Sequence, residues 1–329
     1  MKPSELRDVL PLLIAEKIPS IIWGPPGVGK SSIPEQVCTN LGIECRAWMR
    51  TSQMDSVDVR GIPKMNGGDV MSWAAPDWWI SDPESRGVLV FDEITQGAAS
   101  VMAALMQVVL ERRLGNRILP PGWSILACAN RETDRAGTNR MPSALSRRFT
   151  HINLEPDVPD WCSWALSSGR ILPELVAFIR FRPELLHDFD PKRPVDPNPR
   201  AWERASRIVD MKLNPDTELQ LLVGTVGEGA AIEATAFLRI WRGLPSIDGV
   251  LLNPTTTAIP AEPSAQFAIA GALARRATDR NFDSVLTYVE RIGVEMLAYC
   301  VKDAVARDPT LQATRSFVTW SVKYQELFS

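Results

Sequence analysis

The sequence predicts an α/β protein in which a parallel sheet flanked by helices is followed by an all-helical region. Three observations lead to this prediction. The apolar run Ile21–Trp23 leads into a glycine-rich segment, the apolar run 87–91 ends in two carboxylates, and from Trp161 onward the apolar spacing is helical. Unbroken apolar runs are typical of parallel strands buried on both faces, and helices cover such sheets.

The glycine-rich segment fits the pattern G-x-x-x-x-G-K-[ST] at each fixed position. Its glycines allow backbone conformations that turn successive N–H groups toward one phosphate. Lys30 would place a cation against the β- and γ-phosphates, and the Ser31 hydroxyl would bind Mg²⁺. A helix beginning near Lys30 would point its positive end at the same phosphates. The predicted nucleotide contacts are Gly24, Pro25, Pro26, Gly27, Val28, Gly29, Lys30, Ser31 and Ser32.

Two carboxylates follow the strand predicted over 87–91. In an enzyme with such a phosphate loop, Asp92 would lie beside the metal together with Ser31, and Glu93 would orient and deprotonate water. The complete pair argues against a scaffold that binds nucleotide without hydrolysing it. A third apolar run, 123–129, ends in the amide of Asn130, which we expect to hold the attacking water or the γ-phosphate.

The composition narrows the class of protein. The 329 residues suggest two domains, and the net charge of −3 gives no overall basic footprint for nucleic acid. Five scattered cysteines without a CxxC pair favour reduced thiols and a cytoplasmic location. Only two histidines make a zinc site or a histidine-based triad unexpected. No signal peptide or membrane span is expected.

Two turn-rich stretches interrupt the predicted core. Residues 61–79 contain a turn signal at 66–69 and read as an inserted hairpin or loop. Lys64, Met65 and Asn66 are the candidates for a loop that faces a pore or partner, with an ordinary solvent-exposed hairpin as the alternative. Trp73, Trp78 and Trp79 either anchor this loop in the core or form a partner-facing surface. A second hairpin is expected at 112–120.

By their order along the chain, these segments resemble an AAA+ ATPase of the MoxR-type branch. Residues 24–31 are similar to Walker A, 88–93 to Walker B and 126–130 to the sensor-1 strand with its terminal Asn. Residues 144–149 resemble the "aLxxRF" segment that carries an arginine finger, and 198–201 resemble the start of the lid helix, where sensor 2 lies. The two turn-rich stretches fall where that branch has its helix-2 insert and pre-sensor-1 hairpin.

The resemblance implies a homo-oligomeric ring, usually a hexamer, that binds ATP and Mg²⁺ between subunits. It implies a core over 1–160, a helical lid over 161–245 and, beyond the resemblance, a helical C-terminal extension over 246–329. Arg200 is the expected sensor 2, with pairing to Glu203 as the alternative. The arginine finger is Arg147 or Arg148, and Arg148 is favoured because it directly precedes Phe149. The segment Ile94-Thr95-Gln96 departs from the Asn-Arg often found in relatives.

Two functions follow from this interpretation. The leading one is an ATP-driven ring that remodels or activates a protein partner, and the resemblance implies partners with von Willebrand factor A-type domains. The alternative is a nucleic-acid-dependent motor or loader, in which Arg112, Arg113 and Arg117 would track a phosphate backbone. Arg112 and Arg113 could instead lie at a subunit interface and contact the neighbour's nucleotide. The preference for ATP over GTP is implied by the resemblance, because the sequence shows no base-reading motif.

Overall fold

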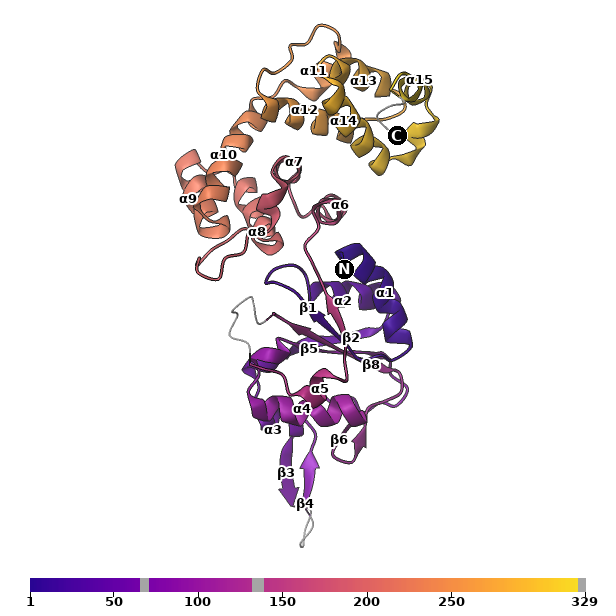
Figure 1. Cartoon of the computed structure of the whole chain (residues 1–329), viewed down its shortest axis with the longest axis vertical. Helices are drawn as coiled ribbons and strands as arrows, with labels where there is room; N and C mark the ends of the chain where they lie inside the picture. The colour runs from indigo at the N-terminus through magenta and orange to yellow at the C-terminus, as the bar shows by residue number, and fades with distance from the viewer. Residues whose placement is uncertain (66–70, 132–138, 325–329) are drawn as a thin grey trace. The chain divides into compact units, whose positions relative to one another are not determined.

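The computed structural model describes residues 1–65, 71–131 and 139–324, with the backbone alone described at 47–49. The chain divides into two compact units (Figure 1). The first consists of Met1–Trp161 and His187–Ala201, and the second of Cys162–Leu186 and Trp202–Ser329. Helices α6 (Val158–Ser168) and α8 (Pro199–Asp210) contain the division points.

A five-stranded parallel sheet organises the first unit. Its order is β2 (Glu44–Arg50), β5 (Gly87–Asp92), β8 (Trp123–Ala129), β1 (Ser20–Trp23) and β9 (Thr150–Asn153). Trp23 is in register with Ala129, and Arg50 with Asp92. The residues that follow β1, β5 and β8 therefore meet at one edge of the sheet, as the sequence predicted.

Alternating side chains fill a hydrophobic layer on each face of this sheet. Ile22, Val88 and Leu126 pack with α1 (Pro3–Ala15) and α2 (Ser32–Leu41). Ile21, Leu89 and Ile125 pack on the opposite face, which is covered by α4 (Ala99–Glu111) and by the shorter α3 (Ser56–Arg60) and α5 (Ser143–Ser146) (Figure 1). Helices on both faces explain why the central strands β1, β5 and β8 are almost entirely apolar and buried.

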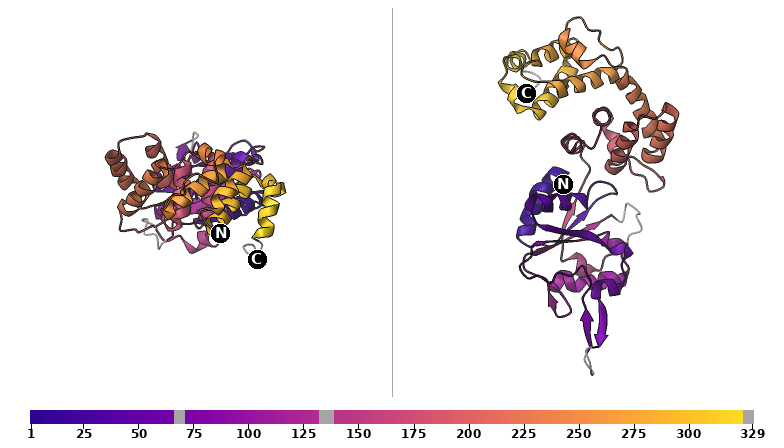
Figure 2. Two further views of the ribbon diagram at one scale, coloured as in Figure 1. Left: turned by 90° about the horizontal axis from the view of Figure 1, so that it is seen from above. Right: turned by 180° about the vertical axis from the view of Figure 1, so that it is seen from behind.

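Both expected hairpins are present. Strands β3 (Ile62–Met65) and β4 (Met71–Ala74) are antiparallel and extend away from the five-stranded sheet, as the two directions of view in Figures 1 and 2 show. Asn66 lies outside the described residues. Trp78 and Trp79 are buried and anchor the insertion, whereas Trp73 is 40% exposed on β4. The second hairpin joins β6 (Arg113–Leu114) to β7 (Arg117–Ile118).

The second unit is helical in its described residues, as predicted from the apolar spacing. Phe282, Val285 and Val289, three apolar residues of that spacing, are buried in its core. Glu218 is buried and forms a bidentate ion pair with Arg242. Besides parts of α6 and α8, it contains α7 (Pro173–Phe181), η4 (Pro183–Leu186), α9 (Pro215–Val226), α10 (Glu228–Arg242), α11 (Ile247–Leu252), α12 (Pro263–Arg276), α13 (Phe282–Glu290), α14 (Val294–Arg307), η5 (Pro309–Ala313) and α15 (Arg315–Lys323).

None of the helices in the described ranges combines the length and apolar character that crossing a bilayer requires.

Candidate active site

The loop between β1 and α2 forms a cradle that only glycine fits at two positions. Gly27 and Gly29 have φ of +80° and +98°, values that residues with a Cβ rarely adopt. A Cβ on Gly27 would lie 2.4 Å from Asn198 Oδ1, and one on Gly24 would lie 2.8 Å from the carbonyl oxygen of Leu154. Glycine at these positions allows the backbone conformation in which a loop can cradle a phosphate.

Lys30 lies at the centre of the cradle. Its Nζ donates hydrogen bonds to the carbonyl oxygens of Gly24 and Pro25, each at 2.8 Å, and to Asn130 Oδ1 at 2.6 Å. Lys30 and Asn130 are far apart in the chain, but they follow neighbouring strands of the sheet. A γ-phosphate placed on this loop would meet a cation and an amide together.

A buried thiol forms a hydrogen bond to the backbone at the end of this loop. Cys128 Sγ donates to the carbonyl oxygen of Lys30 at 3.2 Å. Burial raises the pKa of the Cys128 thiol well above its usual value. The thiol therefore stays protonated, so it remains a hydrogen-bond donor over the physiological pH range.

The residues expected at a magnesium ion are in direct contact. Ser31 Oγ donates to Asp92 Oδ2 at 2.8 Å. A hydroxyl and a carboxylate supply the hard oxygen ligands that Mg²⁺ prefers, and Mg²⁺ bound to nucleotide commonly uses few protein ligands. The donor set therefore fits Mg²⁺ beside the phosphate loop.

Glu93 is held by a segment that sequence reasoning did not single out. Its backbone adopts the left-handed conformation (φ 54°), and its carboxylate accepts a hydrogen bond from Ser52 Oγ at 2.5 Å. Thr51 Oγ1 donates to the carbonyl oxygen of Glu93 at 2.7 Å. Both hydroxyls belong to the short helix η1 (Thr51–Gln53), which follows β2, the strand beside β5. The sequence signal that could have identified this segment is the pair of hydroxyl residues, Thr51 and Ser52, directly after the strand β2.

A cavity of about 760 Å³ opens beside the Ser31–Asp92 pair. Arg200, predicted as sensor 2, lies in its wall together with Arg50, which the sequence analysis missed. Glu203, the alternative partner considered for Arg200, pairs with Arg207 at 2.8 Å. The cavity is lined by Ser31, Glu35, Thr39, Ile43, Cys45, Arg50, Gln53, Asp92 and Arg200.

Arg147 and Arg148 follow α5, and both are exposed. Neither forms an ion pair with a residue in the described ranges, and neither lines the cavity that Arg200 and Asp92 share. Phe149 is buried in the sheet core and fixes the segment. The structure thus leaves both guanidinium groups at the surface of the first unit.

A glycine cradle with its lysine, an acidic strand end and a polar amide at one sheet edge define a P-loop ATPase with the AAA+ fold. Residues 19–149 match the family described as AAA domain (dynein-related subfamily). This match spans the phosphate loop, both carboxylates, Asn130 and the two arginines after α5. The protein has the AAA+ P-loop fold with a helical C-terminal region, and it is an ATPase.

Solved structures with low sequence identity also resemble the chain. NtrX of Brucella abortus, in complex with ADP, is 14% identical, with 99% of this chain and 68% of that chain covered and a TM-score of 0.40. The same protein in complex with ATP is 14% identical, with coverages of 93% and 66% and a TM-score of 0.40. A RuvB variant of Thermotoga maritima is 15% identical, with 82% of each chain covered and a TM-score of 0.36.

Proposed function

We propose that this protein is a Mg²⁺- and ATP-dependent ring ATPase that remodels or activates a protein partner, like members of the MoxR-type branch that its sequence resembles. The proposal includes a hexamer, a cytoplasmic location and a partner with a von Willebrand factor A-type domain. The observation that carries it is the apolar surface of the β3–β4 hairpin.

One face of this hairpin consists of apolar side chains. The register pairs Pro63 with Trp73 and Met65 with Met71, and residues directly opposite in an antiparallel pair share a face. Met65 is 61% exposed, Met71 52% and Trp73 40%. Apolar surface gathered in this way marks interaction sites, and methionine-rich surfaces adapt to varied apolar sequences. The face therefore fits a polypeptide better than a phosphate backbone.

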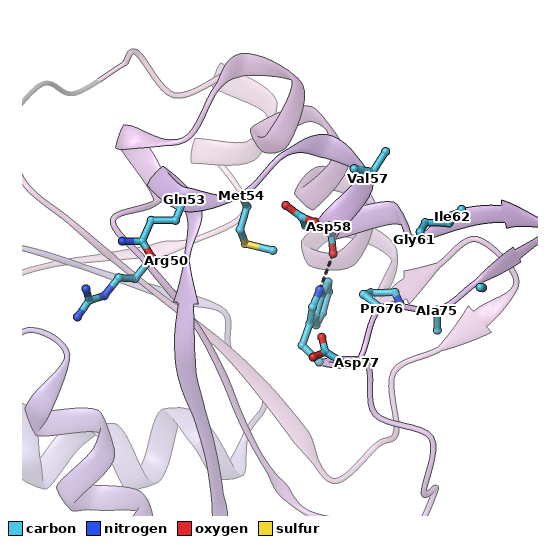
Figure 3. Close-up of a pocket in the computed structure, with 12 residues that line it drawn as sticks. Arg50, Gln53, Met54, Val57, Asp58, Gly61, Ile62, Ala75, Pro76 and Asp77 are labelled. Carbon is cyan, nitrogen blue, oxygen red and sulfur yellow. Dashed lines mark hydrogen bonds between the residues drawn. The ribbon is translucent and has the colours of Figure 1, made fainter.

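A pocket of about 430 Å³ at the base of the hairpin supports the same proposal (Figure 3). Met54 and Asp58 line it from the η1–α3 segment, and Pro76 and Asp77 from the segment after β4. Arg50 also lines the cavity beside Asp92, and so does Gln53. Because the two cavities share these residues, a partner at the hairpin could affect the segment that holds Glu93.

The catalytic roles that we propose follow the contacts. Lys30 and Asn130 would bind the γ-phosphate, Ser31 and Asp92 would hold Mg²⁺, and Glu93 would take the proton from the attacking water. When bound, Mg²⁺ would supply charge neutralisation for the phosphate oxygens. The other two roles fall to arginines.

Arg200 would act within its own subunit. Arg148, or its neighbour Arg147, would reach the nucleotide of the adjacent subunit, which is consistent with the exposure of both side chains. An arginine finger is worth about 10³–10⁵ in rate.

Most of the arginines that the nucleic-acid alternative requires make contacts within the protein. Arg112 is turned inward and donates to the carbonyl oxygens of Pro120 and Trp123, the latter at 2.7 Å. Desolvation lowers the pKa of Arg112, as expected for a half-buried guanidinium. Arg113 donates to the carbonyl oxygen of Gly115 and pairs with Glu111 at 3.5 Å. Arg117 alone of the three is left without such a contact in the described residues.

We also propose that the helices over 161–245 form a lid, apart from residues 187–201, which belong to the first unit, and that 246–329 form an extension with its own core. Phe282 and Trp320 are buried together in one cluster of that extension. In the proposed ring, ATP turnover would move this lid, and the extension would form an additional contact between subunits.

The test is ATP hydrolysis across a series of protein concentrations, with sizing, with added single-stranded or duplex DNA, and with a von Willebrand factor A-domain protein. The proposal expects a rate per subunit that rises with assembly, rises further with the protein partner and ignores DNA. Turnover that depends on DNA and falls with salt would establish the motor instead.

A subunit-mixing experiment tests the arginine finger. Arg148→Ala should retain nucleotide binding but lose hydrolysis in the assembled ring. Mixing it with Lys30→Ala subunits should restore some activity at hybrid interfaces, which combine an intact loop with an intact finger. An absence of rescue in rings of normal size would contradict action between subunits, and the same experiment with Arg147→Ala would decide between the two.

A further inference from the structure

A second cavity, of about 480 Å³, lies beside Asn130 and is distinct in its lining from the cavity beside Asp92. Asn130 connects it to the phosphate loop, because its Oδ1 accepts the hydrogen bond from Lys30 Nζ. The cavity is lined by Trp23, Thr95, Asn130, Asn139, Arg140, Met141, Pro142, Ser143 and Ser146. None of the catalytic roles proposed above uses it.

Thr95 forms part of its wall, two residues after Glu93. It belongs to the segment Ile94-Thr95-Gln96, which directly follows the two carboxylates. Thr95 is 3% exposed, and its Oγ1 has no hydrogen-bond partner among the described residues. Its carbonyl oxygen accepts from Asn139 N at 2.6 Å, so residues 139 and 140 are held against the segment that carries Glu93.

The charge of the lining residues favours an anion. Among the described residues of its lining, Arg140 is the cation and none is a carboxylate, and Arg140 forms no ion pair with a residue in the described ranges. Two other donors are already used: Trp23 Nε1 donates to His151 Nδ1 at 2.9 Å, and Asn139 Nδ2 donates to the carbonyl oxygen of Gly97 at 3.0 Å. Arg140 and the hydroxyl of Ser143 remain as donors among the described lining residues, because Thr95 Oγ1 is inaccessible and Ser146 Oγ lies 3.5 Å from His151 Nε2.

We propose that this cavity is a second oxyanion subsite that receives inorganic phosphate after hydrolysis, with Arg140 as its main ligand. The proposal rests on ATP turnover at Lys30. Attack of water on the γ-phosphorus breaks the bond to ADP and leaves a free phosphate anion between Lys30 and Asn130. Asn130 contacts Lys30 and also lines the cavity that contains Arg140, so it adjoins both phosphate positions. Arginine binds phosphate through paired hydrogen bonds.

The experiment separates this subsite from the γ-phosphate position. The full-length protein is saturated with ADP and beryllium fluoride, which occupies the γ-position, and inorganic phosphate is then titrated in and followed by ³¹P NMR or calorimetry. Wild-type protein is expected to bind phosphate under these conditions. Loss of phosphate binding once beryllium fluoride is present would show a single phosphate position and overturn the proposal.

Matched variants assign the ligand. Arg140→Gln should weaken phosphate binding about tenfold or more, because one charge-assisted pair is lost. Arg140→Lys should recover part of the affinity. Arg131→Gln is the control, since Arg131 adjoins Asn130 but pairs with Glu155 and is absent from the cavity wall. Thermal unfolding checks that each variant folds.

Two results would contradict the assignment. Equal phosphate affinity of Arg140→Gln and wild type would remove Arg140 from the site. Loss of ring assembly in Arg140→Gln with unchanged phosphate affinity would show that Arg140 binds an acidic group of a neighbouring subunit instead. ATP turnover and partner stimulation, measured on the same wild-type preparation, report separately on the proposed function, because no partner enters the phosphate titration.

Discussion

Two regions of the first unit differ in how their functional groups are satisfied. At the sheet edge, Lys30 and Asn130 contact each other and Ser31 contacts Asp92, at distances of 2.6–2.8 Å. On the β3–β4 hairpin, Met65 and Trp73 are exposed on the same face, and no hydrogen bond joins their side chains to the other described residues. The first region is made of paired polar groups, and the second of uncovered apolar surface.

The difference teaches what each region can bind. A phosphate can replace the internal contacts of Lys30, and Mg²⁺ would take the place of the hydrogen bond between Ser31 and Asp92, so the polar groups are already in position for a bound nucleotide. Binding at the hairpin is favourable only when a large apolar surface covers it, because the free energy released on burying apolar area is about 25 cal/mol per Å². A small ligand therefore suits the edge, and a macromolecule suits the hairpin.

Lys30→Ala should have the largest effect of these variants, and it acts on nucleotide binding at the sheet edge. It removes the cation that we expect to contact the β- and γ-phosphates. Because each charge-assisted hydrogen bond is worth about 1.5–3 kcal/mol, nucleotide affinity should fall about 100-fold or more. Fluorescent-nucleotide titration measures the loss, with thermal unfolding as the control for folding. Affinity close to wild type would show that nucleotide binds elsewhere.

Glu93→Gln should separate binding from chemistry at the same edge. The amide keeps the shape of the side chain but cannot accept a proton from water. Turnover should fall by about 10²–10⁴, the usual contribution of a general base, while ATP affinity stays close to wild type. Single-turnover hydrolysis measures the change. A wild-type rate in this variant would remove Glu93 as the base.

Met65→Ser combined with Trp73→Ser should remove the apolar surface of the β3–β4 hairpin. The hairpin lies outside the nucleotide site, so the basal rate per subunit should stay within about twofold, whereas stimulation by the protein partner should be lost because the apolar contact area is gone. Leu12→Ser on α1 is the matched control, since Leu12 is 65% exposed at another place. Full stimulation of the double variant would show that the hairpin is not needed for partner binding.

Ser52→Ala should have the smallest effect of these variants, and it tests how the segment beside Glu93 controls turnover. Its hydroxyl holds the Glu93 carboxylate at 2.5 Å, and its loss should free Glu93 and raise basal turnover by about twofold to fivefold, in the range of one hydrogen bond. Partner stimulation should shrink by a similar factor if the partner acts through the same segment. Steady-state hydrolysis with and without partner measures both, and a drop in basal rate would show that Ser52 positions Glu93 for catalysis.

The elements of the sheet edge were predictable because their signals are local. The glycine spacing of 24–29, the apolar run before Asp92 and the strand before Asn130 each lie within one short segment. Parallel strands then bring their carboxyl ends together without further information. The burial of Val88 on one face and Leu89 on the other also follows from alternation along a strand.

The remaining site residues depend on topology, which short patterns do not contain. Ser52 reaches Glu93 only because β2 lies beside β5, and Asn198 approaches Gly27 from a segment far along the chain. Arg112 shows the converse. Its charge suggested a surface role, but it ends α4 in the left-handed conformation (φ 51°) and turns inward to backbone carbonyls.

The contact between Gly27 and Asn198 has a consequence for dissecting the molecule. The first unit is assembled from two separate stretches of chain, and His187–Ala201 is the second of them. A fragment that stops at Trp161 would keep every strand of the sheet and the whole phosphate loop, yet it would lack both Asn198 and Arg200. An autonomous nucleotide-binding fragment thus calls for a graft, in which residues 187–201 are rejoined to 161 through a linker in place of the excised helices.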